Sequence, residues 1–230
     1  MFLKVLSIIS LLLGAPLSHQ MASPWMKSKE KQKLIQSAIL STQADSGMVT
    51  LLKAKSMSRH ILKAAHCFEI DPIIYAALIW RESTFKQNSK SPTGAVGLSQ
   101  LTKPGIQEVI DRVSVGSKRK NKMLLSQMAT CYPQVLKSMP RDPRKADLQV
   151  WKNRISQSSE LSIIFGAALF RTYFKGNYQK ALERYNGEPQ MKHRFASDVI
   201  ALSVWISSSL RVIPEAALEN SKFLASIRDF

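Results

Sequence analysis

One carboxylate, Glu82, stands where an unbroken apolar run ends, in the stretch "IIYAALIWRESTF". Burial in an apolar pocket disfavours the ionised form of an acid, and the carbonyl groups at a helix C-terminus disfavour a nearby anion. Both effects predict that Glu82 stays protonated near neutral pH. A general acid needs this state in order to donate a proton to a leaving oxygen. Taken alone, this helix favours the simpler interpretation, in which Glu82 is an exposed side chain in a fraying last turn.

A second carboxylate is not evident from the local sequence. Glycosidases ordinarily place two carboxylates about 5 to 9.5 Å apart. Asp71 precedes Glu82 by eleven residues on the same expected helix, which puts it roughly 16 Å away. Asp71 is therefore excluded as the partner, whereas Glu108, Glu160 and Glu188 stay open as residues that hold a water if the fold brings them close.

Helices are the elements expected to position these groups. Asp71 and Pro72 form a helix start, because aspartate caps free amides and proline is tolerated in the first turn. The run that follows is apolar on every face and must be buried. Periodicity predicts further helices over about 27–43, 48–66, 161–174, 195–208 and 214–228, with a shorter one capped by Asn177 and ended by Gly187. No pattern of strands or repeats is present, so we expect a mainly α fold.

Three motifs occur in order along the chain: "ALIWRESTF", "SPTGAVGLSQL" and "ALERYNGEP". Together they resemble the catalytic domain of the soluble lytic transglycosylases, the family that also contains the goose-type lysozymes. The resemblance extends from roughly Met48 to Ser208. It implies a lysozyme-like α-helical domain with a substrate cleft.

The resemblance also assigns roles to individual residues. Glu82 is implied to be the catalytic acid and then the base, with Ser83 lining the cleft beside it. Tyr185 is implied to form a hydrogen bond with Glu82 and orient it, while Asn186 shapes the cleft floor.

The glycine-containing loop supplies the other implied substrate contacts. Gly97, Leu98 and Gln100 face the substrate, and the Gln100 amide addresses sugar acetamido groups. Ser99 stands where the family often has methionine, so we expect a smaller or more polar cleft wall. Glu188 replaces a residue that is commonly small, which suggests a preference for glycans with free amino groups.

The implied reaction is cleavage of the β-1,4 bond between N-acetylmuramic acid and N-acetylglucosamine in peptidoglycan. A single glutamate would act as acid and base, and the product would carry 1,6-anhydromuramic acid ends. No cofactor is expected. The alternatives are a hydrolytic lysozyme, which could prefer deacetylated peptidoglycan, and a non-catalytic wall-binding protein of the same fold. A basic module that binds lipid or nucleic acid is allowed by charge, but it leaves the motif order unexplained.

The net charge and the N-terminal residues indicate where the protein is located in the cell. The 230 residues carry 33 lysines and arginines against 16 aspartates and glutamates, a formal net charge of +17, which favours polyanionic partners. Residues 1–22 read as a signal peptide. We therefore expect a periplasmic or secreted envelope protein, with peptidoglycan strands as its partner, no nucleic acid, and no membrane span once the signal is removed.

The remaining chain is expected to consist of an N-terminal helical arm over 23–47 and a catalytic domain over 48–230. A basic insertion at about 103–154 either is a solvated face or contacts anionic envelope polymers. Cys67 and Cys131 are allowed to pair in an oxidising compartment, although the sequence leaves their pairing open. The four histidines form no metal-binding pattern.

Overall fold

The computed structural model describes residues 28–43, 50–187 and 190–209. Within them no strand occurs, and the predicted mainly α fold is confirmed. The helices are α2 (Ser28–Gln43), α3 (Leu51–Cys67), α4 (Pro72–Ser83), α5 (Lys103–Val113), α6 (Lys122–Cys131), α7 (Pro133–Lys137), α8 (Leu148–Gln157), α9 (Ser159–Tyr173), α10 (Tyr178–Asn186) and α11 (Lys192–Ser209), with a 3-10 turn, η2 (Pro143–Lys145). The expected signal peptide and the helix over 214–228 lie outside the described residues.

Helix α4 begins as its sequence predicts. The Asp71 carboxylate accepts hydrogen bonds from the backbone N–H groups of Ile73 and Ile74, at 2.8 and 3.1 Å. Two other helices also hold this end, since Lys31 of α2 pairs with Asp71 at 3.5 Å and the Asp71 N–H donates to the Tyr178 hydroxyl oxygen of α10 at 2.8 Å. The start of α4 is therefore fixed to helices from both ends of the described chain.

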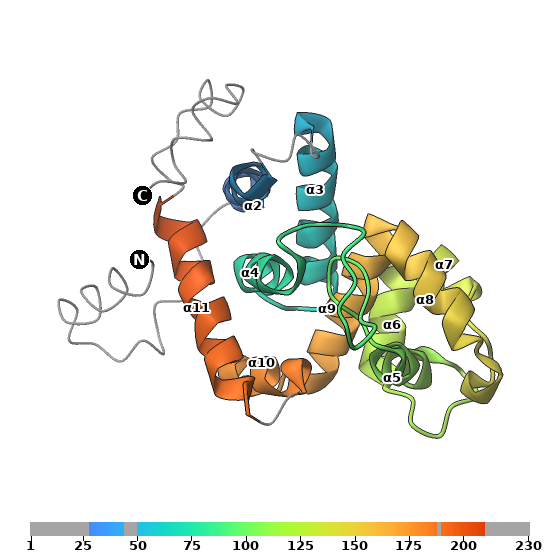
Figure 1. Ribbon diagram of the computed structural model, residues 1–230. Coiled ribbons are helices and arrows are strands. Elements are labelled where there is room, and N and C mark those ends of the chain that lie inside the picture. The colour runs from blue at the N-terminus through green and yellow to red at the C-terminus, as the bar shows by residue number, and fades with distance from the viewer. Residues whose placement is uncertain (1–27, 44–49, 188–189, 210–230) are drawn as a thin grey trace.

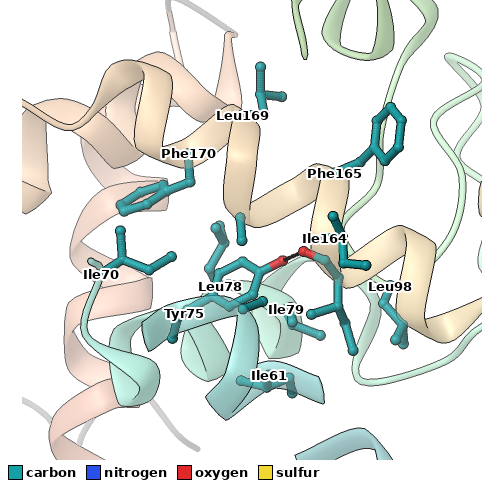
Figure 2. Packing of buried hydrophobic residues seen from close by; sticks show 14 of the residues in the cluster. Ile61, Ile70, Tyr75, Leu78, Ile79, Leu98, Ile164, Phe165, Leu169 and Phe170 are labelled. Atoms are coloured by element: carbon teal, nitrogen blue, oxygen red, sulfur yellow. Dashed lines mark hydrogen bonds between the residues drawn. The ribbon is translucent and has the colours of Figure 1, made fainter. Parts of the chain in front are cut away.

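The body of α4 is buried, as its uniformly apolar sequence requires. Its residues from Ile73 to Ile79 are at most 1% exposed. Figure 1 views α4 along its axis, with α2, α3 and α11 around it. On the side of α9, Tyr75 and Leu78 pack near Ile164 and Phe170 (Figure 2). No helix of the described chain combines the length and apolar character needed to cross a membrane.

Helix α2, part of the segment expected to be an N-terminal arm, packs into this core. Ile35, Ala38 and Ile39 are fully buried, and α2 packs along α3 and against α4. The reason is that these apolar residues recur at steps of three and four, which gives α2 one continuous inward face.

The basic segment 103–154 is also packed onto the domain. It forms α5 to α8, which gather beyond α9 (Figure 1). Trp151 of α8 lies on Phe165 of α9, with ring centroids 5.2 Å apart. A disulfide joins Cys67, at the end of α3, to Cys131, at the end of α6. Basic side chains thus cover the outside of a segment whose inside is apolar.

Because Asp71 has several partners, its replacement is expected to destabilise the fold. Replacing Asp71 with Ala is expected to lower the free energy of unfolding by about 2 kcal/mol, because it removes a helix cap and leaves Lys31 without its partner. The matched control is Asp147→Ala, which removes the exposed cap of α8 and should cost about 1 kcal/mol. Urea denaturation measures both. Equal losses would contradict the idea that the Lys31 pair adds to the cap.

Candidate active site

The chain turns sharply directly after Glu82. Thr84 and Phe85 both adopt left-handed backbone conformations, with φ of 50° and 58°. Such values are uncommon for non-glycine residues and persist only where surrounding contacts enforce them. Here the Phe85 side chain is buried and lies against Trp80, with ring centroids 6.2 Å apart. The turn leaves Glu82 half-buried in the last turn of α4.

Two glycines let the following loop approach α9 closely. Gly97 has φ of 76°, and a Cβ there would lie 2.6 Å from Ser162 Oγ. A Cβ on Gly166 of α9 would overlap the Ser99 side chain. Both glycines are needed for contact between loop and helix rather than for flexibility.

Ser99 connects four parts of the fold through hydrogen bonds. Its N–H donates to Ser162 Oγ of α9 at 3.2 Å, and its hydroxyl lies 3.3 Å from the Tyr75 hydroxyl of α4. Its carbonyl oxygen accepts a hydrogen bond of 2.8 Å from the Tyr185 hydroxyl of α10. Tyr75 in turn donates to the Ile163 carbonyl oxygen at 2.5 Å, the dashed line in Figure 2. We call Ser99, Tyr75, Tyr185 and Ser162 the Ser99 network.

Tyr185 comes from a distant part of the chain to the end of α4. Burial raises the pKa of its hydroxyl well above the usual value, and electrostatic interactions with Tyr75 and Glu82 raise it further. Glu82 and Tyr185 are therefore within electrostatic range of each other, and the tyrosine stays neutral at physiological pH.

Four residues predicted to contact substrate, Ser83, Gly97, Leu98 and Ser99, are buried in the protein. Leu98 and Ser99 are 0% exposed, and Ser83 is 5% exposed, with its hydroxyl donating to the Ile79 carbonyl oxygen at 3.1 Å. The expected polar cleft wall at Ser99 is thus an internal contact. The physical reason is Gly166, whose missing side chain leaves room for Ser99 against α9.

Gln100 and Asn186 lie nearer the surface. Gln100, which has φ of 44°, donates from Nε2 to the carbonyl oxygens of Ser89 and Gly97, at 3.1 and 2.8 Å. Its N–H groups therefore brace the loop, and its amide oxygen is the atom suited to accept from a sugar amide. Asn186 ends α10 with its Nδ2 buried and without a hydrogen-bond partner in the protein. Glu188 lies outside the described residues.

Several residues of the site were missed by sequence reasoning. Tyr75 carries a hydroxyl inside a run that is otherwise apolar, and a buried tyrosine usually finds a partner for that group. Gly166 interrupts the apolar helix α9, which often marks a close approach. Ser162 has no distinguishing local signal.

A cluster of charges lies beside the site. Burial and the charge of Glu108 raise the pKa of Tyr173, whereas Arg112, Arg119 and Arg184 lower it. Tyr173 also raises the pKa of Tyr185, so the cluster is connected to the site electrostatically.

The described residues hold no cluster of metal ligands, and the hollow beside the disulfide is lined by none of the site residues. In the described part of the chain, no group of three or more histidine, cysteine, aspartate or glutamate residues is arranged to hold a metal ion. A hollow of about 500 Å³ is lined by residues beside the disulfide, Arg59, Leu62, Lys63, His66, Cys67 and Cys131. None of the site residues lines it, so the chemistry is assigned from the residues at Glu82 and not from this hollow.

Comparison with known proteins identifies one part of the chain. Residues 59–129 match the family model of the transglycosylase SLT domain. No curated protein and no solved structure matches the chain. The matched segment contains Glu82 and the loop from Gly97 to Gln100, and this domain is associated with cleavage of peptidoglycan. The resemblance predicted from the sequence is confirmed over residues 59–129, which are similar to the transglycosylase SLT domain.

Proposed function

We propose that this protein is a peptidoglycan lytic transglycosylase of the bacterial envelope, with Glu82 as its catalytic acid and base. One observation carries the proposal. Tyr185 lies outside the matched segment, yet its hydroxyl is bonded to Ser99 within that segment and is influenced by the charge of Glu82. A chance match confined to residues 59–129 gives no reason for a tyrosine from α10 to complete the site.

In the proposed reaction, protonated Glu82 donates its proton to the oxygen that joins N-acetylmuramic acid to N-acetylglucosamine. The bond breaks through an oxocarbenium-like state. Ionised Glu82 then accepts the proton of the muramic acid's own C6 hydroxyl, whose oxygen attacks C1. The product is a 1,6-anhydro sugar, and no water is consumed. A tethered hydroxyl has a high effective concentration, which favours this attack over attack by water.

Tyr185 supports both halves of this cycle. Its only hydroxyl proton is donated to Ser99, so its oxygen is able to accept a hydrogen bond from protonated Glu82 and orient it. Because burial keeps the tyrosine neutral, it adds no negative charge when Glu82 ionises. Tyr185 is thus suited to hold the acid in place without opposing proton release.

The surroundings of the other glutamates also favour a single acid. Both oxygens of Glu108 accept hydrogen bonds from arginines, Arg112 and Arg119. Glu160 lies 3.7 Å from His60 Nδ1 at the start of α9. Neither carboxylate is positioned by the Ser99 network.

Glu82→Gln is expected to abolish release of soluble muropeptides, with a rate loss of about a hundredfold or more, since general acid–base catalysis contributes that much. Glu160→Gln is the matched control, because its carboxylate is on the described surface and its loss should leave the rate nearly unchanged. Purified peptidoglycan and chromatography of the released fragments provide the measurement. A Glu82→Gln variant that folds normally and keeps its activity would refute the assignment.

Tyr75→Phe is expected to lower kcat about tenfold with little change in KM, since it removes a buried hydrogen-bonding hydroxyl of about 1 kcal/mol that helps position Ser99. The pH dependence of kcat should shift as well, because Tyr185 would be held less firmly beside Glu82.

Tyr178→Phe is the control for Tyr75→Phe. It also removes a hydroxyl partner of α4, but at the Asp71 end, far from the chemistry. We expect Tyr178→Phe to lower stability without changing the pH profile. If both variants lose stability and neither changes kcat, then the Ser99 network serves folding alone.

A further inference from the structure

Two basic loops are joined into one surface beyond α5. They are residues 114–122 and residues 140–145, which we call the two-loop surface. The Gly116 N–H donates to the Arg141 carbonyl oxygen at 3.0 Å, and the Ser114 hydroxyl donates to the Pro140 carbonyl oxygen at 2.9 Å. A Cβ on Gly116 would lie 2.8 Å from the Arg141 oxygen. Glycine is therefore required for the two loops to meet this closely.

The acidic side chains near these loops already form ion pairs with arginines of the same segment. Arg119, whose side chain is 57% exposed, pairs with Asp111 at 2.8 Å and with Glu108 at 2.5 Å, and Arg112 also pairs with Glu108 at 2.7 Å. The exposed cations that remain on the two loops are Lys118, Lys120, Lys122, Arg141, Arg144 and Lys145, and of these Arg144 pairs with Asp142. The result is a concentrated positive surface on a rigid base.

The composition of the surface indicates which anion it fits. Lysines predominate, and a lysine ammonium binds phosphate as a point charge without requiring one fixed orientation of the phosphate group. A membrane is a poorer match, because Val115 is the one large apolar side chain of these loops that is prominently exposed, at 62%. Stable attachment to lipid normally needs a broader apolar face.

The surface is built on the same packed helices as the candidate active site. Its loop 114–122 follows α5, which packs against α9, and α9 supplies Ser162 and Gly166 to the contacts of Ser99. A polymer held on the two-loop surface would therefore be attached to the same domain as Glu82.

We propose that the two-loop surface binds a linear polymer of repeating phosphodiester groups and so retains the enzyme beside its substrate. This role rests on the proposed function, but the binding itself does not depend on cleavage. Poly(glycerol phosphate) is a suitable probe of this chemistry. Vesicles of phosphatidylglycerol present similar groups as a membrane, and a single-stranded DNA oligonucleotide presents them as a nucleic acid.

The test measures binding of the full chain to the three probes in the Glu82→Gln background, so that no cleavage interferes. Lys118→Gln, Lys122→Gln and Lys145→Gln together should weaken binding of poly(glycerol phosphate) about tenfold, since each surface charge contributes about a factor of two. The control changes Lys29, Lys53 and Lys55 to Gln, three exposed lysines of α2 and α3. It has the same net charge and should bind within about twofold of the parent protein.

Gly116→Ala tests the geometry without changing any charge. It should weaken binding severalfold, because the two loops can no longer meet, while circular dichroism reports an intact helical fold.

The proposal is overturned if both lysine triples weaken binding equally, since net charge alone would then explain the attraction. It is equally overturned if phosphatidylglycerol vesicles or DNA bind more tightly than poly(glycerol phosphate). If the wild-type protein binds the polymer but does not cleave peptidoglycan, the proposed function is wrong, whereas the binding role of the two-loop surface stands.

Discussion

The hydrogen bond from the Tyr185 hydroxyl to the Ser99 carbonyl oxygen holds the candidate site together. It joins residues 86 positions apart in the sequence and connects α10 to the loop that follows α4. The same serine also contacts α4 through Tyr75 and α9 through Ser162. Because Ser99, Tyr75 and Ser162 are buried, losing one partner leaves the others without compensation from water. The position of Tyr185 therefore depends on the packing of three helices on one short loop.

Local chemistry made part of this arrangement predictable. The start of α4 at Asp71 follows from the capping of free amides, and the left-handed Gly187 after α10 follows from the freedom of glycine at helix ends. The location of Glu82 at the end of a buried helix also follows from the sequence. A run that is apolar on every face must be buried, and the polar residues that follow it mark the end of the helix.

The depth of the loop was not predictable in this way. Whether Leu98 and Ser99 face a ligand or the protein depends on Gly166, which is far along the chain and acts only through packing. The burial of α2 likewise depends on the faces of α3 and α4 that receive its apolar residues. Long-range contacts thus decide where α2 and the loop are placed, whereas element boundaries are set by nearby residues.

The central claim is that Glu82, after donating its proton, takes one from the sugar's own C6 hydroxyl and not from water. Digestion of purified peptidoglycan in water enriched in oxygen-18, followed by mass spectrometry of the soluble fragments, tests it most directly. The account predicts anhydromuramic acid ends that contain no heavy oxygen. Fragments whose reducing ends carry the label, or no soluble fragments at all, would contradict it.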